Sequence, residues 1–152
     1  MDQNQQAVEK IRSHHAALLR GLRSRSEALL EAAAEGHSAK APAADMLLYL
    51  REEIVPHAAA EEETLYKRGL ALEDLAALLR AMIAEHVRLR SLTADLEAAA
   101  APLRQAAIAM AITEIFDLHA GKENDILLPR LAREPGVRVK GLLGEMHRLL
   151  EG

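Results

Sequence analysis

Residues 108–128 read IAMAITEIFDLHAGKENDILL, and this stretch indicates the fold class. Its apolar side chains recur at intervals of about three or four positions, the spacing that places them on one face of an α-helix. His119 and Glu123 lie in the same phase, so both are expected to point inward. The full stripe comprises residues 108, 112, 115, 116, 119, 123, 126 and 127. The stretch therefore predicts a long helix that buries an imidazole and a carboxylate.

Similar stripes predict three more long helices and one short one. Gly36 should end the first helix, Pro56 should kink the second, and a turn around Gly69 should precede the third. A linker over 36–45, with Asp45 as a possible N-cap, should separate the first two. The expected bounds are about Gln5 to Glu35, residues 47–65, about Leu72 to Ala100, Pro102 to Pro129 or to 134–136, and Val137 to Leu150.

The composition favours closely packed helices. Half of the residues are hydrophobic but only 2% are aromatic, so the core must be built from alanine, leucine, isoleucine, valine and methionine. A chain of 152 residues encloses one core. We expect an all-α, up-down-up-down four-helix bundle as a single domain over 1–152, with a short C-terminal helical extension over 137–152. That extension offers Leu142, Leu143, Met146, Leu149 and Leu150 for docking.

Charge and cysteine content exclude several classes of function. The net charge is −4 with the two signs interspersed, which argues against a nucleic-acid partner. The chain has no cysteine, so any metal must be held by nitrogen and oxygen. The first ten residues lack the basic-then-apolar pattern of a signal peptide, and no apolar run reaches the length of a membrane span. These features predict a cytoplasmic protein without a membrane partner.

Each predicted long helix carries one histidine on its apolar stripe. His57, His86 and His119 are in phase with their apolar neighbours, and on the first helix His15 fits the phase better than His14. His14 nevertheless stays open as an alternative on that helix. The two remaining histidines, at 37 and 147, are expected on the surface.

Two of these histidines begin an H-x-x-x-E motif. Residues 57–63 read HAAAEEE and residues 119–125 read HAGKEND, and helix residues four apart lie on the same side. The buried carboxylates need a positive partner, yet neither stripe contains lysine or arginine. A metal site of six residues is therefore predicted, with a nitrogen and oxygen donor set that suits iron or manganese and is possible for zinc. Its members are His15, His57, Glu61, His86, His119 and Glu123.

Other chemical motifs are absent from the sequence. It contains no H-E-x-x-H, no E-x-x-H of the ferritin-like di-iron bundles, no G-x-S-x-G and no P-loop. Hydrolase and nucleotide-binding functions therefore have no support.

The segments SHHAALLRGL, PHAAAEEETLY, AEHVRLRSL and DLHAGKENDILLPRL resemble the four helix motifs of the hemerythrin-like family, in its HHE cation-binding branch. The resemblance spans about residues 8–131. It implies that the four histidines are terminal ligands and that Glu61 and Glu123 bridge two iron ions, together with an oxide or hydroxide. Oxygen-carrying members are similar but have a further histidine four residues from the one on the third helix, where this chain has Met82 and Arg90. The resemblance thus favours reaction at the irons over reversible oxygen carriage.

These observations lead to one main functional hypothesis and two alternatives. We expect a non-haem di-iron protein that binds or reduces dioxygen, peroxide or nitric oxide; an enzyme of this kind would be peroxidase- or catalase-like, or nitric-oxide-reducing. Tyr49 or Tyr66 either supports such a site or packs in the core. The alternatives are a non-catalytic iron or oxygen sensor or storage module, and a metal-free interaction bundle.

Overall fold

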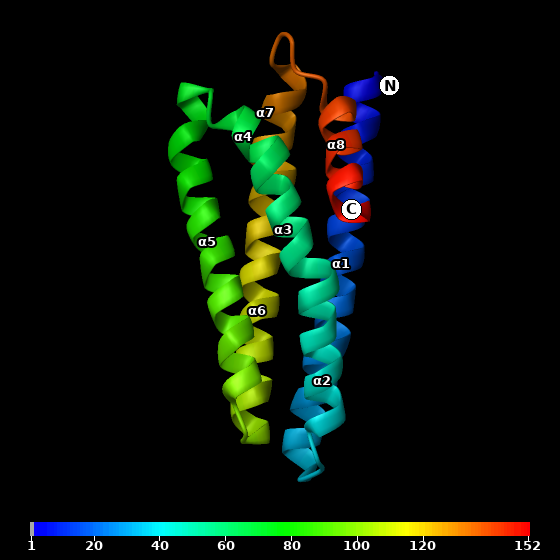
Figure 1. Cartoon of the computed structure of the whole chain (residues 1–152), viewed down its shortest axis with the longest axis vertical. Helices are drawn as coiled ribbons and strands as arrows, with labels where there is room; N and C mark the ends of the chain where they lie inside the picture. Colours follow the sequence, from blue (N-terminus) through cyan, green and yellow to red (C-terminus); the bar gives the residue numbers. More distant parts are fainter. Residues whose placement is uncertain (1) are drawn as a thin grey trace.

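The computed structural model describes residues 2–152, which form helices joined by short turns. No strand occurs within that range, so the all-α expectation is confirmed. In Figure 1 the chain runs down the molecule along α1, back through α2 and α3, down again along α5 and back along α6 and α7. These helices are α1 (Gln3–Glu35), α2 (Lys40–Tyr49), α3 (Val55–Glu61), α5 (Glu73–Ala98), α6 (Pro102–Lys122) and α7 (Leu128–Arg133).

The ends of α1 follow from its capping residues. The Asp2 carboxylate accepts a hydrogen bond from the Gln5 amide at 2.8 Å, and Gly36 ends the helix with φ at 69°, as its position predicts. The expected linker over 36–45 is too long. The next helix, α2, already begins at Lys40, because Pro42 falls in its first turn, where a missing amide hydrogen costs no helical bond. Asp45 is therefore within the helix and does not cap it.

The second rod contains two π-helical turns. The turn η1 (Leu50–Ile54) lies directly before Pro56, at the place where the sequence predicted a kink, and a wider turn accommodates a residue that cannot donate a hydrogen bond. The second turn, η2 (Glu62–Tyr66), begins immediately after Glu61, and α4 (Lys67–Gly69) completes the rod. The turn predicted around Gly69 follows it.

The fourth rod continues through Pro129 and ends at Arg133, so the later of the two predicted ends is the observed one. A third π-helical turn, η3 (Glu123–Leu127), separates α6 from α7. Such a turn contains more residues than an α-helical turn and so rotates the side chains that follow it. The expectation that Ile126 is buried is consequently wrong: Ile126 is 49% exposed, whereas Leu127 is fully buried.

The last helix, α8 (Val139–Glu151), turns back beside α1, so both chain ends lie on the same side of the molecule in Figure 1. Its docking face is shorter than predicted. Met146 is buried and Leu142 and Leu143 pack against the core, but Leu149 and Leu150 are 52% and 40% exposed. The helix covers α1, α3 and η2 through its first two turns and Met146.

The buried apolar residues form two separate cores, so the expectation of one core is wrong. One, the terminal core, contains Val8 and Val139 near the chain ends, and the other, the distal core, contains Leu29 and Met46 near the α1–α2 turn. On every long helix the predicted metal-ligating histidine lies between a residue of one core and a residue of the other. The flanking pairs are Ile11 and Leu18, Ile54 and Ala60, Met82 and Leu89, and Phe116 and Leu127. The buried polar residues therefore form a layer between two apolar regions.

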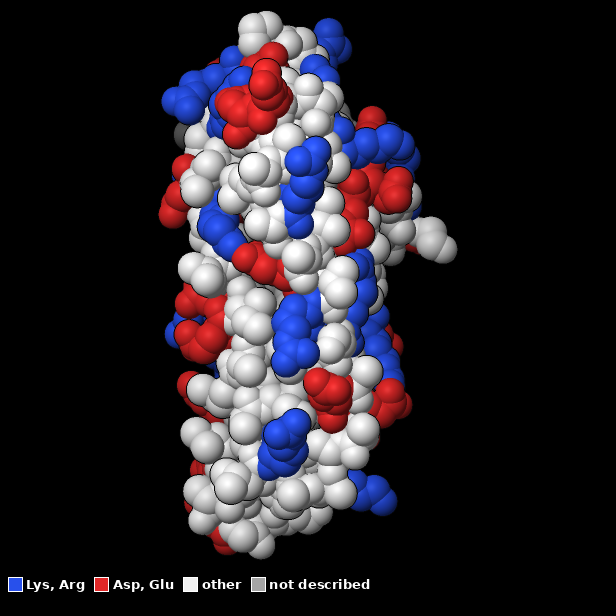
Figure 2. Space-filling model, turned by 90° about the vertical axis from the view of Figure 1, so that its left-hand side faces the viewer, with Lys and Arg blue, Asp and Glu red and all other residues white. Residues whose placement is uncertain are grey.

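The surface carries charges of both signs. On the face shown in Figure 2, lysine and arginine side chains alternate with aspartate and glutamate and do not form one basic field. Within residues 2–152, no helix combines the length and the apolarity needed to cross a membrane.

Candidate metal centre

The structure brings all six predicted residues together from four helical rods. His15 comes from α1, His57 and Glu61 from α3, His86 from α5, His119 from the end of α6, and Glu123 from the start of η3. Each is only 1–2% exposed. The two H-x-x-x-E motifs thus place their side chains in one buried cluster, as their helical phase predicted.

Glu61 and Glu123 occupy the centre of this cluster. The Nε2 atom of His57 lies 2.7 Å from Glu61 Oε1, and Nε2 of His15 lies 3.2 Å from the same oxygen. The Nε2 atom of His86 lies 3.5 Å from Glu61 Oε2. Oε1 of Glu123 lies 2.5 Å from His119 Nε2, and Oε2 of Glu123 lies 3.4 Å from His15 Nε2. Imidazole nitrogens from four rods therefore converge on two carboxylates.

The donor atoms divide into two groups that share Glu61. One group contains Glu61, His86, His119 and Glu123, and the other contains His15, His57 and Glu61. The donor atoms of each group lie within 4.8 Å of one another, close enough to contact a single metal ion. Of the two candidates on α1, His15 is in the cluster, whereas His14 is exposed and contacts the His57 ring from outside at 5.0 Å between centroids.

The two carboxylates have opposite electrostatic environments. Burial opposes ionisation of Glu61, but the charge of His57 and the hydrogen bond from His15 hold its pKa well below the usual value. Burial and the neighbouring charge of Glu61 raise the pKa of Glu123. Burial lowers the pKa of His15, but its hydrogen bond to Glu61 and the charge of Glu123 outweigh burial and raise that pKa to about 9. Without a metal, the His15 imidazole therefore supplies positive charge beside the two carboxylates.

Several buried polar atoms of the cluster lack a hydrogen-bond partner. Both ring nitrogens of His57 and Oε2 of Glu123 form no hydrogen bond. Nε2 of His57 lies 2.7 Å from Glu61 Oε1, but without hydrogen-bond geometry. Leaving a buried polar atom unpaired costs about 1–3 kcal/mol. A cation held by these atoms would remove that cost, and the set of four imidazoles and two carboxylates suits iron, manganese or zinc. The buried cluster can therefore hold a metal.

The comparison with protein families agrees with this geometry. The family described as Hemerythrin HHE cation binding domain matches residues 6–131. The chain belongs to the hemerythrin family. The match includes all six cluster residues and ends before α8. Comparisons with curated proteins and with solved structures gave no match.

In this hemerythrin domain, three side chains hold three of the four imidazoles in place from outside the cluster. We call them the outer ring; they are Asn124, Glu62 and Glu85. Nδ1 of His15 pairs with Asn124 Oδ1 at 2.8 Å, Nδ1 of His86 with Glu62 Oε1 at 2.8 Å, and Nδ1 of His119 with Glu85 Oε2 at 2.7 Å. A proton on Nδ1 leaves Nε2 free to face the cluster, which is how ligating histidines are oriented in metal sites. Arg90 pairs with Glu62, and Lys122 pairs with Glu85.

Sequence reasoning missed two members of this ring. Glu62 and Glu85 bond to histidines 24 and 34 residues away on other helices, and no local spacing signals such a pair. The third member, Asn124, follows Glu123 of the second motif directly in the sequence. Met82, one of the two positions considered for a further histidine, is a fully buried residue of the terminal core.

The two tyrosines have different environments. The Tyr66 hydroxyl donates to Glu123 Oε1 at 2.9 Å and lies 2.8 Å from His119 Nε2. Its ring stacks on His86 with centroids 5.2 Å apart. Tyr49 instead donates to the Leu18 carbonyl at 3.2 Å. Of the two tyrosines considered as neighbours of the centre, Tyr66 contacts it and Tyr49 does not.

Proposed function

We propose that this hemerythrin domain is a non-haem di-iron protein that binds or reduces a small oxidant, namely dioxygen, peroxide or nitric oxide. The observation that supports it most is that Glu61 belongs to both donor groups. A carboxylate shared in this way can bridge two ions. Under this proposal the chain forms one up-down-up-down four-helix domain over 1–152, with 137–152 as its extension.

The proposed division of ligands follows the geometry. His15 and His57 would hold one ion, His86 and His119 the other, and Glu61 and Glu123 would lie between them. Four imidazoles, two bridging carboxylates and one bridging oxide or hydroxide fill about ten of about twelve positions around two six-coordinate ions. When bound, two iron ions supply electrons for reduction and one open position each for an exogenous ligand.

The protein's own side chains shape what reaches that position. All six ligands are buried, so bulk water is kept from the centre. Burial and the charges of Glu61 and Glu123 raise the pKa of Tyr66, so its hydroxyl keeps its proton. That proton is donated to Glu123, and an oxidant bound at the centre would compete with Glu123 for it. Tyr66 is therefore the residue best placed to donate to an oxidant beside His119 and Glu123. The neutral hydroxyl also adds no third negative charge there.

Metal analysis tests the proposal. Protein purified without chelator should contain about two irons per chain, and its visible spectrum should change on addition of peroxide or nitric oxide. Glu61→Ala should lose both ions together, whereas Glu63→Ala, at an exposed position of the same helical rod, should retain them. Loss of only one ion in Glu61→Ala would contradict the shared bridge. Absence of metal after anaerobic iron loading would favour the metal-free interaction bundle.

The buried carboxylate pair also supports the sensor alternative. Without metal, Glu61 raises the pKa of Glu123, which shows that the two charges oppose each other in the folded protein. Metal occupancy would then control how tightly the helices pack, and a partner could recognise the difference. Limited proteolysis of metal-free and iron-loaded protein tests this alternative, because equal protection of the two forms would exclude it.

A further inference from the structure

One of the four histidines has no partner on its outer side. Nδ1 of His57 forms no hydrogen bond, whereas Nδ1 of His15, His86 and His119 each bonds to a side chain of the outer ring. His57 also lines a cavity of about 140 Å³ between α1, α3 and α8. Since water occupies about 30 Å³ in the liquid, this space is large enough for a molecule of two or three heavy atoms. His57 is therefore the one cluster histidine that has no outer-ring partner and also lines this cavity.

The walls of this cavity are apolar and its rim is basic. Ile11 of α1 and Leu143, Met146 and Leu150 of α8 form the apolar walls. Around them stand His14 and Lys10 of α1 and His147 of α8, and no carboxylate is among the lining residues. The lining suits a small neutral molecule or a monoanion better than a cation.

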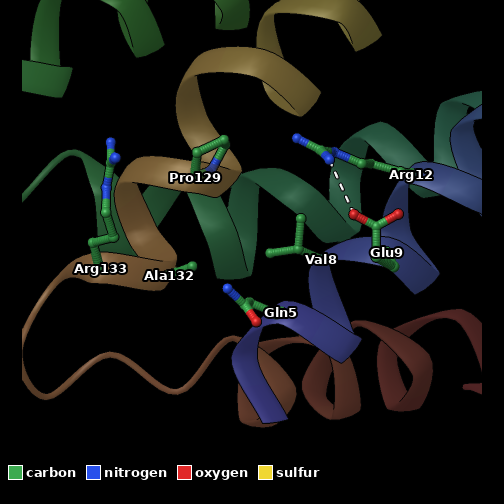
Figure 3. Close-up of a pocket in the computed structure, with 7 residues that line it drawn as sticks. All are labelled: Gln5, Val8, Glu9, Arg12, Pro129, Ala132 and Arg133. Carbon is green, nitrogen blue, oxygen red and sulfur yellow. Dashed lines mark hydrogen bonds and ion pairs between the residues drawn. The ribbon is translucent and has the colours of Figure 1, made fainter. Parts of the chain in front are cut away.

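A larger groove of the molecule does not reach the cluster. The groove between α1 and α7 in Figure 3 has a volume of about 400 Å³ and is lined by residues such as Val8, Arg12 and Pro129, none of which belongs to the cluster. On the α1 side of this groove Arg12 pairs with Glu9, the interaction dashed in Figure 3. The size of a cavity therefore does not identify the route to the centre. The smaller cavity is the better candidate because His57 is one of its lining residues.

We propose that the cavity between α1, α3 and α8 is the access chamber through which small ligands reach the metal centre from the side of His57. This inference rests on the proposed function. The outer wall of the chamber is formed by α8. This helix lies outside the part of the chain that matches the family, which ends at residue 131. Leu150, which is 40% exposed, stands at the outer end of that wall and controls passage.

Azide, a triatomic monoanion, is a suitable probe for passage into the iron-loaded full-length protein. Leu150→Trp should slow azide association and dissociation equally, by about tenfold, and leave the equilibrium constant and the iron content unchanged. Leu149→Trp is the matched control, because Leu149 is exposed on the same helix but does not line the chamber. It should bind azide at the wild-type rate. Equal rates in wild type and Leu150→Trp would place access elsewhere and overturn the proposal.

A second measurement does not depend on iron. Crystals of metal-free protein under xenon pressure should show a xenon atom beside Ile11 and Met146, which Leu150→Trp should displace and Leu149→Trp should retain. An empty chamber under xenon would also overturn the proposal. If azide leaves the spectrum of iron-loaded wild type unchanged, the proposed function fails, and the xenon experiment still decides whether the chamber admits small molecules.

Discussion

At the scale of single residues, the outer ring nitrogens of the four buried histidines determine how firmly each imidazole is held in place. Glu62 and Glu85 each accept a hydrogen bond from an imidazole, and each is itself paired with a cation. A carboxylate in this position makes the imidazole a stronger base and hence a better ligand. His57 lacks such a partner on its outer nitrogen, which forms no hydrogen bond.

Replacement of Glu85 by glutamine tests this role. The amide oxygen can still accept from His119, but the negative charge is lost, so iron affinity should fall by about 10- to 100-fold. Competition with a chelator measures the affinity. Glu114→Gln, at an exposed position of α6, is the control and should leave it unchanged. Equal affinities for the two variants would show that Glu85 acts only through packing.

Tyr66 and Tyr49 allow a matched comparison of a hydroxyl at the centre and one away from it. Tyr66→Phe removes a donor to the buried Glu123 carboxylate and should lower the free energy of unfolding of metal-free protein by about 1.5–3 kcal/mol, the range for a hydrogen bond to a charged group. Tyr49→Phe removes a donor to a neutral carbonyl and should cost about 0.5–1.5 kcal/mol. Urea unfolding in the presence of chelator compares them. The reverse order would mean that Glu123 does not depend on Tyr66.

The residues of the cluster could be predicted from the sequence, whereas two of their outer-ring partners could not. Helical phase was sufficient to choose the six cluster residues and to prefer His15 over His14, because phase decides which side chains point inward. It could not identify Glu62 or Glu85, because each is defined by a contact with a different helix. Such contacts depend on how neighbouring helices are rotated and shifted along their axes relative to one another. The apolar pattern of a single helix does not contain that information.

At the scale of helices, periodicity predicted the number, type and approximate ends of the long helices but not their internal irregularities. The three π-helical turns were missed, since each adds less than one residue to a long stripe and leaves the overall period almost unchanged. The exposure of Ile126 is the visible consequence. Two of the turns begin at or directly after the glutamate of an H-x-x-x-E motif, as expected for π-turns that accompany functional sites.

The position of α8 depends on one side chain of α1. Asn4 donates to the carbonyls of Ala132 and Val137 at 3.3 and 3.1 Å and accepts from the Val139 amide at 2.9 Å, which caps the start of α8. Asn4→Ala should accelerate hydrogen exchange in α8 while exchange in α5 and α6 stays unchanged. The exposed Gln3→Ala is the control. Unchanged protection of α8 in Asn4→Ala would show that its apolar face suffices to hold it.

At the scale of the whole molecule, the polar cluster is a layer that crosses all four rods and separates the two apolar cores. The charges of Glu61 and Glu123 are buried in this layer. Burying them is costly unless positive charge lies beside them, so tight packing of the rods around the cluster requires such a charge. A metal bound by residues of all four rods would therefore stabilise every rod, and its removal should lower the free energy of unfolding of the whole chain.

Metal removal measures that effect. With free iron at about 100 times its dissociation constant, the loaded protein should be more stable than the chelator-treated protein by about 2.7 kcal/mol, because only the folded state assembles the ligands. The double variant His57→Ala and His119→Ala should lose this increment, since it removes one imidazole from each donor group. The double variant His37→Ala and His147→Ala changes two exposed histidines and should keep it. Denaturant titrations of the three proteins, each with iron and with chelator, compare the increments. A full increment in the first double variant would mean that iron stabilises the fold from a place other than the buried layer.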